Sequence, residues 1–413
     1  MMKFIKTPVK GMRDILPNEM EIREYVINQI YETYSQFGFR KIDTPCVEHI
    51  ENLTNKQGGE NEKLIFKILK RGEKLKLDDM TTKDDLSDSG LRYDLTVPLS
   101  RYYANNMNEL DKPFKALQIG SVFRADRPQK GRFRQFVQCD IDIFGDKTNL
   151  SEIELILATT TLLKKIGLSN FKVKINDRRI LKTIALLSGF EEKDCDSVFI
   201  SLDKMDKIGL DGVRSELLEN GYSKDCVEFY LSVFEKDKSS ATKFYKSLEN
   251  DDLDYDVVSN LDSVVSILRD INDINIEFDP TLVRGMSYYT GLIFEIEVEN
   301  YPGSIAGGGR YDNMIEKYAN VSVPACGFSI GFERLINILI ESGYQVPSTK
   351  KKYAVIIDKN INIEELKKVV AKVTDLRNEG YVVNLQQKHK NFKFQKETLE
   401  SQNYEILLGD RDL

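Results

Sequence analysis

Charged side chains of both signs are concentrated between Val122 and Asp142. Pro128 and Gly131 break the middle of this stretch, and apolar and polar residues alternate on both sides, which predicts a β-hairpin with a basic tip. The cations at the tip are Arg127, Lys130, Arg132 and Arg134. The acids and the amide on or beside the strands are Asp126, Gln138, Asp140 and Asp142. Guanidinium groups suit phosphate and carboxylates suit an amine, so one surface could bind both. Taken alone, the stretch also fits a solvated loop between edge strands.

Three later segments combine reactive side chains with glycines. They are Arg284–Tyr289, which leads into an alternating strand, Gly307–Asp312, and Gly331–Arg334, which runs into a helix. Residues of these segments also have structural alternatives. Arg284 could cap a turn, the glycines 307–309 could form a bulge, and Tyr288 and Tyr289 could be ordinary strand aromatics. Asp142 of the hairpin could likewise lie on a solvated face.

Composition limits the classes of protein that these segments fit. The 413 residues carry a net charge of −7, which excludes a globally basic nucleic-acid coat but leaves open a nucleic-acid partner bound by a local basic patch. No apolar run is long enough to span a bilayer. The five cysteines are widely spaced and there are two histidines, which argues against a disulfide framework and a side-chain metal cluster. The N-terminus has no apolar signal region, and we expect a cytoplasmic protein.

Hydrophobic periodicity predicts the elements of the N-terminal part. Apolar residues recur at helical steps after Pro17 and stop before Gly38, which predicts a helix. Residues 39–48 predict a strand, and Pro45 within it belongs at an edge or at a crossing between subunits, because it cannot donate a ladder hydrogen bond. Residues 52–88 predict a strand pair joined by a loop.

The elements around the hairpin follow the same reasoning. Residues 91–103 predict a strand that runs into a helix, with Pro98 at the first helical position. Ser151 and Glu154 have the spacing of a capping box at the start of a second helix. Residues 171–175 alternate as a strand.

The remaining chain divides by composition. Residues 181–270 are helical and rich in Asp, Lys and Ser, which indicates a helical insertion. After a Lys-rich linker, strands alternate with helices over residues 352–413, which predicts a separate small α/β domain with a parallel core.

Taken in order, these segments resemble the class II aminoacyl-tRNA synthetases. The helix ending at Gly38 with Pro45 is similar to their motif 1, residues 123–136 to motif 2, and residues 331–334 to motif 3. Arg284–Tyr289 and Gly307–Asp312 resemble the two signatures of the histidyl-tRNA synthetase family. The resemblance covers essentially the whole chain.

The fold that this resemblance implies is α+β, with an antiparallel class II synthetase catalytic sheet flanked by helices. Residues 1–180 and 271–348 would form the catalytic core, residues 181–270 a helical insertion against the acceptor stem, and residues 352–413 an anticodon-binding-like α/β domain, a strand or so short at its end. The motif 1 helix and the strand around Pro45 would form a homodimer interface.

The resemblance also implies an ATP site. Arg124 would bind the α-phosphate and Arg132 the γ-phosphate, Asp126 would lie beside them, and Phe136 and Arg334 would sandwich the adenine. Magnesium (Mg2+) would be held mainly by the ATP phosphates. Catalysis would fall to Arg124 and Arg284, which stabilise charge as the histidine carboxylate attacks.

The resemblance also implies a histidine site and tRNA contacts, at the positions that match the family's motifs. The α-ammonium would be held by Asp94, Thr96 and Gln138, and the imidazole nitrogens by Asp142 and Tyr289 with Tyr288 beside them. Gln129 and Lys130 would lie where the acceptor end of tRNA(His) passes. The partners implied are therefore ATP, L-histidine, tRNA(His) and a second copy of the chain, with no membrane.

One departure and two alternatives remain. Residue 287 is Ser where the family commonly has Asp, so a support of the histidine pocket is altered. The regulatory histidyl-tRNA synthetase-like subunit of ATP phosphoribosyltransferase shares the core but does not aminoacylate, and a core used for RNA binding alone would have lost the ATP arginines. The presence of Arg124, Arg132, Arg284 and Arg334 favours the synthetase.

Overall fold

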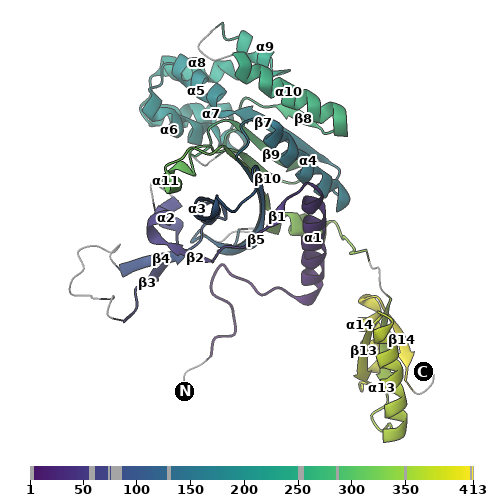
Figure 1. Cartoon of the computed structure of the whole chain (residues 1–413). Helices are drawn as coiled ribbons and strands as arrows, with labels where there is room; N and C mark the ends of the chain where they lie inside the picture. The colour runs from purple at the N-terminus through teal and green to yellow at the C-terminus, as the bar shows by residue number, and fades with distance from the viewer. Residues whose placement is uncertain are drawn as a thin grey trace. The chain divides into compact units, whose positions relative to one another are not determined.

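The chain forms two compact units, Met1–Tyr344 and Gln345–Leu413, each with its own sheet and core (Figure 1). This computed structural model describes residues 4–54, 61–72, 75, 86–127, 132–249, 255–284, 288–347, 351–409 and 412.

A largely antiparallel sheet is the frame of the first unit. In the described part of the chain it has eight strands in the order β1-β5-β6-β11-β10-β9-β7-β8. The inner neighbours are antiparallel, and the edge pairs β1–β5 and β7–β8 are parallel. The predicted antiparallel sheet is confirmed. The strands are β1 (Arg40–Lys41), β5 (Phe114–Phe123), β6 (Gln135–Phe144), β7 (Phe171–Asp177), β8 (Ile276–Phe278), β9 (Leu292–Val298), β10 (Ser304–Arg310) and β11 (Ala325–Gly331).

The predicted basic-tipped hairpin is β5 and β6. Its strands pair from Phe114 with Phe144 to Phe123 with Gln135, and the Arg124 N–H donates to the Arg134 carbonyl at 2.9 Å where the tip begins. Because the two ten-residue strands pair along their whole length, both ends of the cationic loop are fixed on the sheet.

The two faces of β6 serve different purposes. Cys139, Ile141 and Ile143 are buried in the main core, on the side where α1 (Pro17–Gln36) and α4 (Leu150–Lys165) pack. The other face curves around α3 (Thr96–Asn106), which lies in the hollow of the sheet (Figure 1). Tyr103 of α3 stacks on Phe144 of β6 with ring centroids 4.6 Å apart, so α3 is fixed against this concave face.

The N-terminal helix is confirmed, but the strand predicted over residues 39–48 is wrong. Gly38 ends the region of α1 with φ +81°, a conformation that glycine adopts without strain. The following stretch is divided into β1 and β2 (Val47–His49), and β2 belongs to a second sheet with β4 (Ser87–Leu91) and β3 (Lys67–Leu69). Pro45 lies between the two strands, since it lacks the N–H that a continuous ladder needs.

Two predicted helix starts are shifted. Pro98 is the third residue of α3, still in the first turn, where backbone N–H groups have no intrahelical acceptor. The capping box at Ser151 is wrong because α4 already begins at Leu150. The Ser151 hydroxyl donates instead to the carboxylate of Asp146 at 2.8 Å, and the Leu150 N–H donates to the Thr148 hydroxyl at 3.3 Å.

Helices fill the segment between β7 and β8. The described ones are α5 (Arg178–Leu187), α6 (Cys195–Leu202), α7 (Met205–Glu219), α8 (Lys224–Val233), α9 (Ala241–Lys246) and α10 (Tyr255–Asn272). Their buried residues belong to the same core as the sheet. The assignment of residues 181–270 as an insertion therefore stays a prediction.

Short helices complete the first unit. They are α2 (Ile50–Thr54), a 3-10 turn at Asn61–Leu64, another at Glu192–Asp194, α11 (Glu316–Ala319) and α12 (Phe332–Glu341). Glu333 on α12 accepts from Arg23 of α1 through both oxygens at 2.8 Å, so α12 is tied to the back of the sheet.

The second unit has the predicted α/β organisation. Its strands β12 (Lys352–Ile357), β13 (Val382–Gln387) and β14 (Tyr404–Leu408) are parallel in the order β13-β12-β14, and α13 (Ile363–Asn378) and α14 (Phe392–Ser401) form the connections. Among the helices of both units that the structure describes, none has the length and apolarity that crossing a bilayer requires.

Candidate active site

The floor of the candidate site is the concave face of β6. Gln138, Asp140 and Asp142 alternate with core residues, so all three lie on this face. Asp142 stands opposite Gly327 of β11, and a Cβ atom built on Gly327 would lie 2.0 Å from its Oδ1. A side chain at position 327 would therefore displace the carboxylate.

Asp142 is held by a residue that the sequence reasoning did not select. The Tyr311 hydroxyl donates to Asp142 Oδ1 at 2.5 Å, and both side chains are buried. Burial raises the pKa of Asp142 to about 7, against the Tyr311 hydrogen bond, which lowers it. Tyr311 lies within the Gly307–Asp312 segment singled out above but was given no role, and its place in that segment was the signal that could have identified it.

The predicted tyrosine pair lies next to this contact. The ring of Tyr288 meets that of Tyr311 edge-on at 5.8 Å, and the Tyr288 and Tyr289 rings are 4.8 Å apart. Burial raises the pKa of both hydroxyl groups, so each stays a neutral hydrogen-bond donor at physiological pH. The structure thus brings Tyr288 together with Asp142 through Tyr311.

Asp94 and Thr96 stand at the start of α3. One carboxylate oxygen of Asp94 accepts from the Val97 N–H at 3.0 Å, which fixes it at the N-terminal end of the helix. Asp94 is 5% exposed, and burial raises its pKa. The charge of Asp94 raises the pKa of Asp140 and Asp142, so its carboxyl group lies close to both.

Arg124 lies at the start of the hairpin tip. Its guanidinium group lies 4.1 Å from the ring centre of Tyr93 and 5.1 Å from that of Phe136, and its Nε donates to the Tyr93 carbonyl at 3.1 Å. Its positive charge lowers the pKa of Asp94 and Asp140, against their burial. Arg124 therefore lies where it can bind an anion beside the carboxyl cluster.

The other predicted ATP residues lie around the tip and on α12. Arg132 is exposed, and the Asp126 carbonyl accepts from Arg134 at 3.1 Å. Phe136 faces Arg124, whereas Arg334 donates to the Ser304 carbonyl of β10. The adenine sandwich of Phe136 and Arg334 stays a prediction. Gln129 and Lys130 lie outside the described residues.

Arg284 lies over a glycine of β10. Its Nη1 contacts Glu295 of β9 at 3.2 Å, and a Cβ atom on Gly307 would lie 2.2 Å from Nη1. Burial disfavours its charge, but Glu295 and the nearby tyrosine oxygens outweigh this and raise the pKa of Arg284. Its Nε is buried without a hydrogen-bond partner in the described chain, so one donor is open. Ser287 lies outside the described residues.

Gln138 completes the floor. Its amide donates to the Ser329 hydroxyl of β11 at 2.9 Å, and its Oε1 is buried with no partner among the described groups. An open acceptor on Gln138, an open donor on Arg284 and buried carboxyl groups between them suit a ligand that carries both positive and negative groups.

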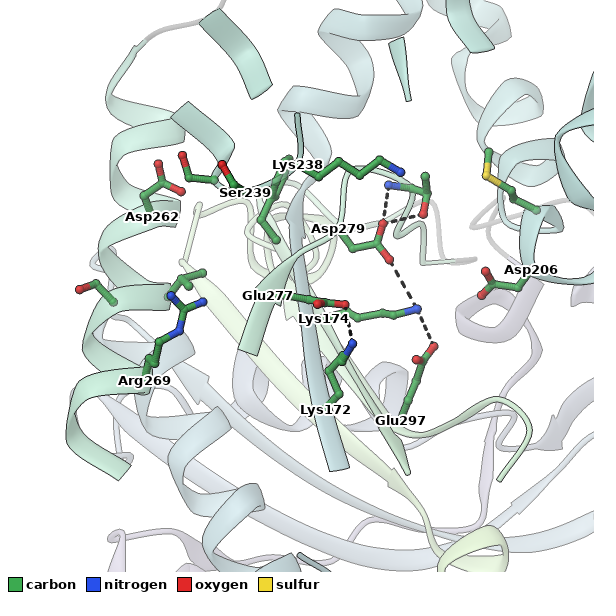
Figure 2. A pocket seen from close by; sticks show the side chains of 16 residues that line it. Lys172, Lys174, Asp206, Lys238, Ser239, Asp262, Arg269, Glu277, Asp279 and Glu297 are labelled. Carbon is green, nitrogen blue, oxygen red and sulfur yellow. Dashed lines mark hydrogen bonds and ion pairs between the residues drawn. The ribbon is translucent and has the colours of Figure 1, made fainter. Parts of the chain in front are cut away.

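A separate pocket of about 860 Å³ lies at the β7–β8 edge (Figure 2). Lys174 reaches between Asp279 and Glu297 at 3.5 and 2.9 Å, and Lys172 contacts Glu277 at 3.1 Å. None of the candidate site residues lines this pocket. Lys172 and Lys174 are thus paired with neighbouring carboxylates.

Within the described ranges no group of three or more His, Cys, Asp or Glu side chains could hold a metal ion.

The fold and the site together define the class. A curved antiparallel sheet that presents arginines, carboxyl groups and glycines around a helix in its hollow is the catalytic domain of a class II aminoacyl-tRNA synthetase. Residues 11–335 match the family described as Histidyl-tRNA synthetase. The chain belongs to the histidyl-tRNA synthetase family.

Individual relatives agree with this assignment. A histidine–tRNA ligase of Leifsonia xyli is 41% identical over 403 residues, which cover 94% of this chain and 91% of that protein. A probable histidine–tRNA ligase of Tropheryma whipplei is 42% identical, over 81% of this chain and 80% of its own.

Solved structures show the same architecture. The histidyl-tRNA synthetase of Nostoc sp. has a TM-score of 0.78 at 26% identity and covers 97% of this chain and 90% of its own. An ATP phosphoribosyltransferase regulatory subunit/histidyl-tRNA synthetase from Bacillus halodurans also has a TM-score of 0.78, at 22% identity over 98% and 99% of the two chains. At this identity the second likeness shows the fold alone.

Proposed function

We propose that this chain is a histidine–tRNA ligase that activates L-histidine with ATP and transfers it to the 3′ end of tRNA(His). The observation that carries the proposal is the buried Asp142–Tyr311 pair on the concave face of β6, with Asp94 close to Asp142 and Arg124 close to Asp94. An imidazole and an ammonium group both need acceptors there, and an acyl phosphate needs cations.

Recognition of the side chain would rest on Asp142, Tyr311 and Tyr289. A carboxylate accepts from one imidazole nitrogen and a tyrosine hydroxyl donates to the other. An apolar amino acid in this pocket would leave these buried groups unpaired, so discrimination of about 10⁴-fold or more without editing is physically reasonable. Asp94, Thr96 and Gln138 would hold the α-ammonium group.

Activation is an in-line displacement. A histidine carboxylate oxygen attacks the α-phosphorus of ATP, the bond to the bridging oxygen breaks, and pyrophosphate leaves. Arg124 and the open Nε–H of Arg284 would stabilise the charge that develops on the α-phosphate oxygens. Arg132 would hold the γ-phosphate and Asp126 would lie beside it, with the adenine between Phe136 and Arg334. Magnesium, bound to the ATP phosphates, would neutralise charge.

Transfer uses no protein nucleophile. A ribose hydroxyl at the tRNA end attacks the carbonyl carbon of the adenylate, and AMP leaves with the bridging oxygen. Positioning of the two reactants supplies much of the rate. Gln129 and Lys130 would guide the acceptor end, and residues 181–270 and 352–413 would contact the acceptor stem and the anticodon.

We also propose a homodimer through α1 and the stretch around Pro45. The motif 1 resemblance supports this, together with the exposed apolar side chain of Val47, which is 48% accessible in the isolated chain. Sedimentation at micromolar concentration should give the mass of two chains. A monomer would contradict the interface.

Charging of tRNA(His) tests the function. The purified protein with ATP should attach labelled histidine to a tRNA(His) transcript and not to a tRNA for another amino acid. Histidine binding without charging would favour the regulatory-subunit alternative.

A further inference from the structure

Asp140 is at the centre of the concave face, and the roles proposed above do not use it. It lies on β6 between Gln138 and Asp142, about 7 Å along the strand from each. It is 3% exposed and stands opposite Gln118 of β5 and Ser329 of β11. The roles proposed so far do not explain a buried carboxyl group at this position.

The hydrogen bonds around Asp140 are incomplete. The Ser329 hydroxyl binds its carboxyl group, but Oδ1 is buried without a partner in the part of the chain that the structure describes. Gln118 is engaged elsewhere: its amide nitrogen donates to the Leu95 carbonyl at 3.3 Å, and its oxygen accepts from Thr44 at 3.1 Å. With the open Oε1 of Gln138, two neighbouring acceptors point to a missing donor.

Positive charge around Asp140 does not balance the negative charge. Asp142, on the same strand, and Asp94, just before α3, are acids whose charges act on it. Arg124, which follows β5, is the cation whose charge acts on Asp140 and on Asp94. Burial, and then the charge of Asp142, raise the pKa of Asp140 well above its usual value. Since one guanidinium group acts on two of these three buried carboxyl groups, another positive charge is required if all three are to ionise.

We propose that Asp140 is a substrate-binding residue whose open oxygen accepts an N–H from the α-ammonium group of the amino acid. Its carboxyl group releases a proton to solvent as the ammonium arrives, so binding exchanges one positive charge for another. The α-ammonium group suits Asp140 better than the imidazole does, because the charges of Arg124 and Asp94 both shift the pKa of Asp140. Both residues belong to the end of the site where the α-phosphate would bind. The inference rests on the proposed function of this site.

A purely structural role explains less. A buried carboxyl group that only anchored Ser329 could be replaced by a neutral side chain at no loss, and it would not retain an open oxygen beside a second one.

Asp140→Asn separates the two roles. The amide matches the size and neutrality of the protonated carboxyl, so the free protein should fold, but it cannot become negative. In histidine-dependent ATP–pyrophosphate exchange, KM for histidine should rise about 10- to 100-fold. KM for ATP should stay unchanged. The matched control is Asp177→Asn, a buried aspartate of β7 whose oxygens bind Arg179 at 2.9 and 2.7 Å, and its KM for histidine should not change.

A second measurement compares proton release by the two proteins. Titration calorimetry of histidine at about pH 6, in buffers of different ionisation enthalpy, should show a larger net proton release for the wild type than for Asp140→Asn. The imidazole of free histidine and the Asp142 carboxyl also titrate near this pH, and their contribution is the same in both proteins. Equal release by the two proteins, or an unchanged KM in a variant that folds, would overturn the role of Asp140. A wild type that binds histidine with the larger proton release but gives no exchange would overturn the proposed function and leave Asp140 supported.

Discussion

Two groups of charged side chains stand on the same sheet and differ in how their charges are satisfied. At the β7–β8 edge, Lys174 lies between Asp279 and Glu297, and these contacts outweigh its burial and raise its pKa (Figure 2). On β6, Asp140 and Asp142 have raised pKa values because burial outweighs their partners. The paired group stabilises the fold. The two carboxyl groups accept hydrogen bonds but have no ion-pair partner among the described residues, so they cost stability, and a ligand that supplies positive charge would explain them.

The largest effect is expected for Arg284→Ala. Removing a donor to the transition state should lower the rate of histidine-dependent ATP–pyrophosphate exchange about 10²- to 10³-fold. The change also leaves Glu295 without its partner and should lower the thermal midpoint, so the rate is measured at a temperature at which the variant is folded. Arg269→Ala is the matched control from the paired region, where Arg269 donates to the Ile276 carbonyl at 2.9 Å, and it should retain the exchange rate. A normal rate for Arg284→Ala would remove Arg284 from catalysis.

Gly327→Ala should alter the site only by displacing the Asp142 carboxylate. The new methyl group would lie 2.0 Å from Asp142 Oδ1, so the carboxylate must move, and kcat/KM for histidine should fall about 10²-fold. In an Asp142→Ala background the same change should have little further effect. Full additivity of the two changes would show that Gly327 does not act through Asp142.

The pH dependence of stability should reveal the buried carboxyl group of Asp142. The pKa of Asp142 is about 7 in the folded chain and about 4 when unfolded, so its contribution to stability is full below about pH 4 and is lost as pH rises through 7. Asp142→Asn should therefore be more stable relative to the wild type at pH 8 than at pH 5. Urea unfolding at both values measures this, and the opposite trend would contradict the burial of an uncompensated carboxyl.

The smallest effect is expected in the paired region. Lys174→Met removes the partner of Asp279 and Glu297 and should lower the free energy of unfolding by about 1–2 kcal/mol. KM for histidine should remain that of the wild type. A variant with normal stability and a raised KM would place Lys174 in the functional site.

The sequence predicted the parts of the fold that depend on local pattern. The α1 helix, the β5–β6 hairpin and the α/β unit after residue 351 follow from periodicity and turn residues. The capping box at Ser151 failed because Asp146, five residues earlier, satisfies the same hydroxyl. The strand through Pro45 failed because its two ends join different sheets, which no local pattern encodes.

The sequence identified residues of the candidate site better than it identified the contacts between them. Asp142 and Tyr289 were selected from motif position, yet the partner that holds Asp142 is Tyr311, which is 169 residues away in the chain. Asp140 was noticed in the hairpin but had no assigned role, since only the register with Ser329 and the nearness of Asp94 reveal its open oxygen. Both depend on strand pairing across the sheet.

Histidine-dependent ATP–pyrophosphate exchange by the wild-type protein tests the central claim most directly. With each of the twenty amino acids supplied in turn, histidine alone should support exchange, and Asp142→Asn should lose it while Lys174→Met keeps it. Exchange with no amino acid, or equal exchange with an apolar one, would contradict the account of the β6 face as a histidine site.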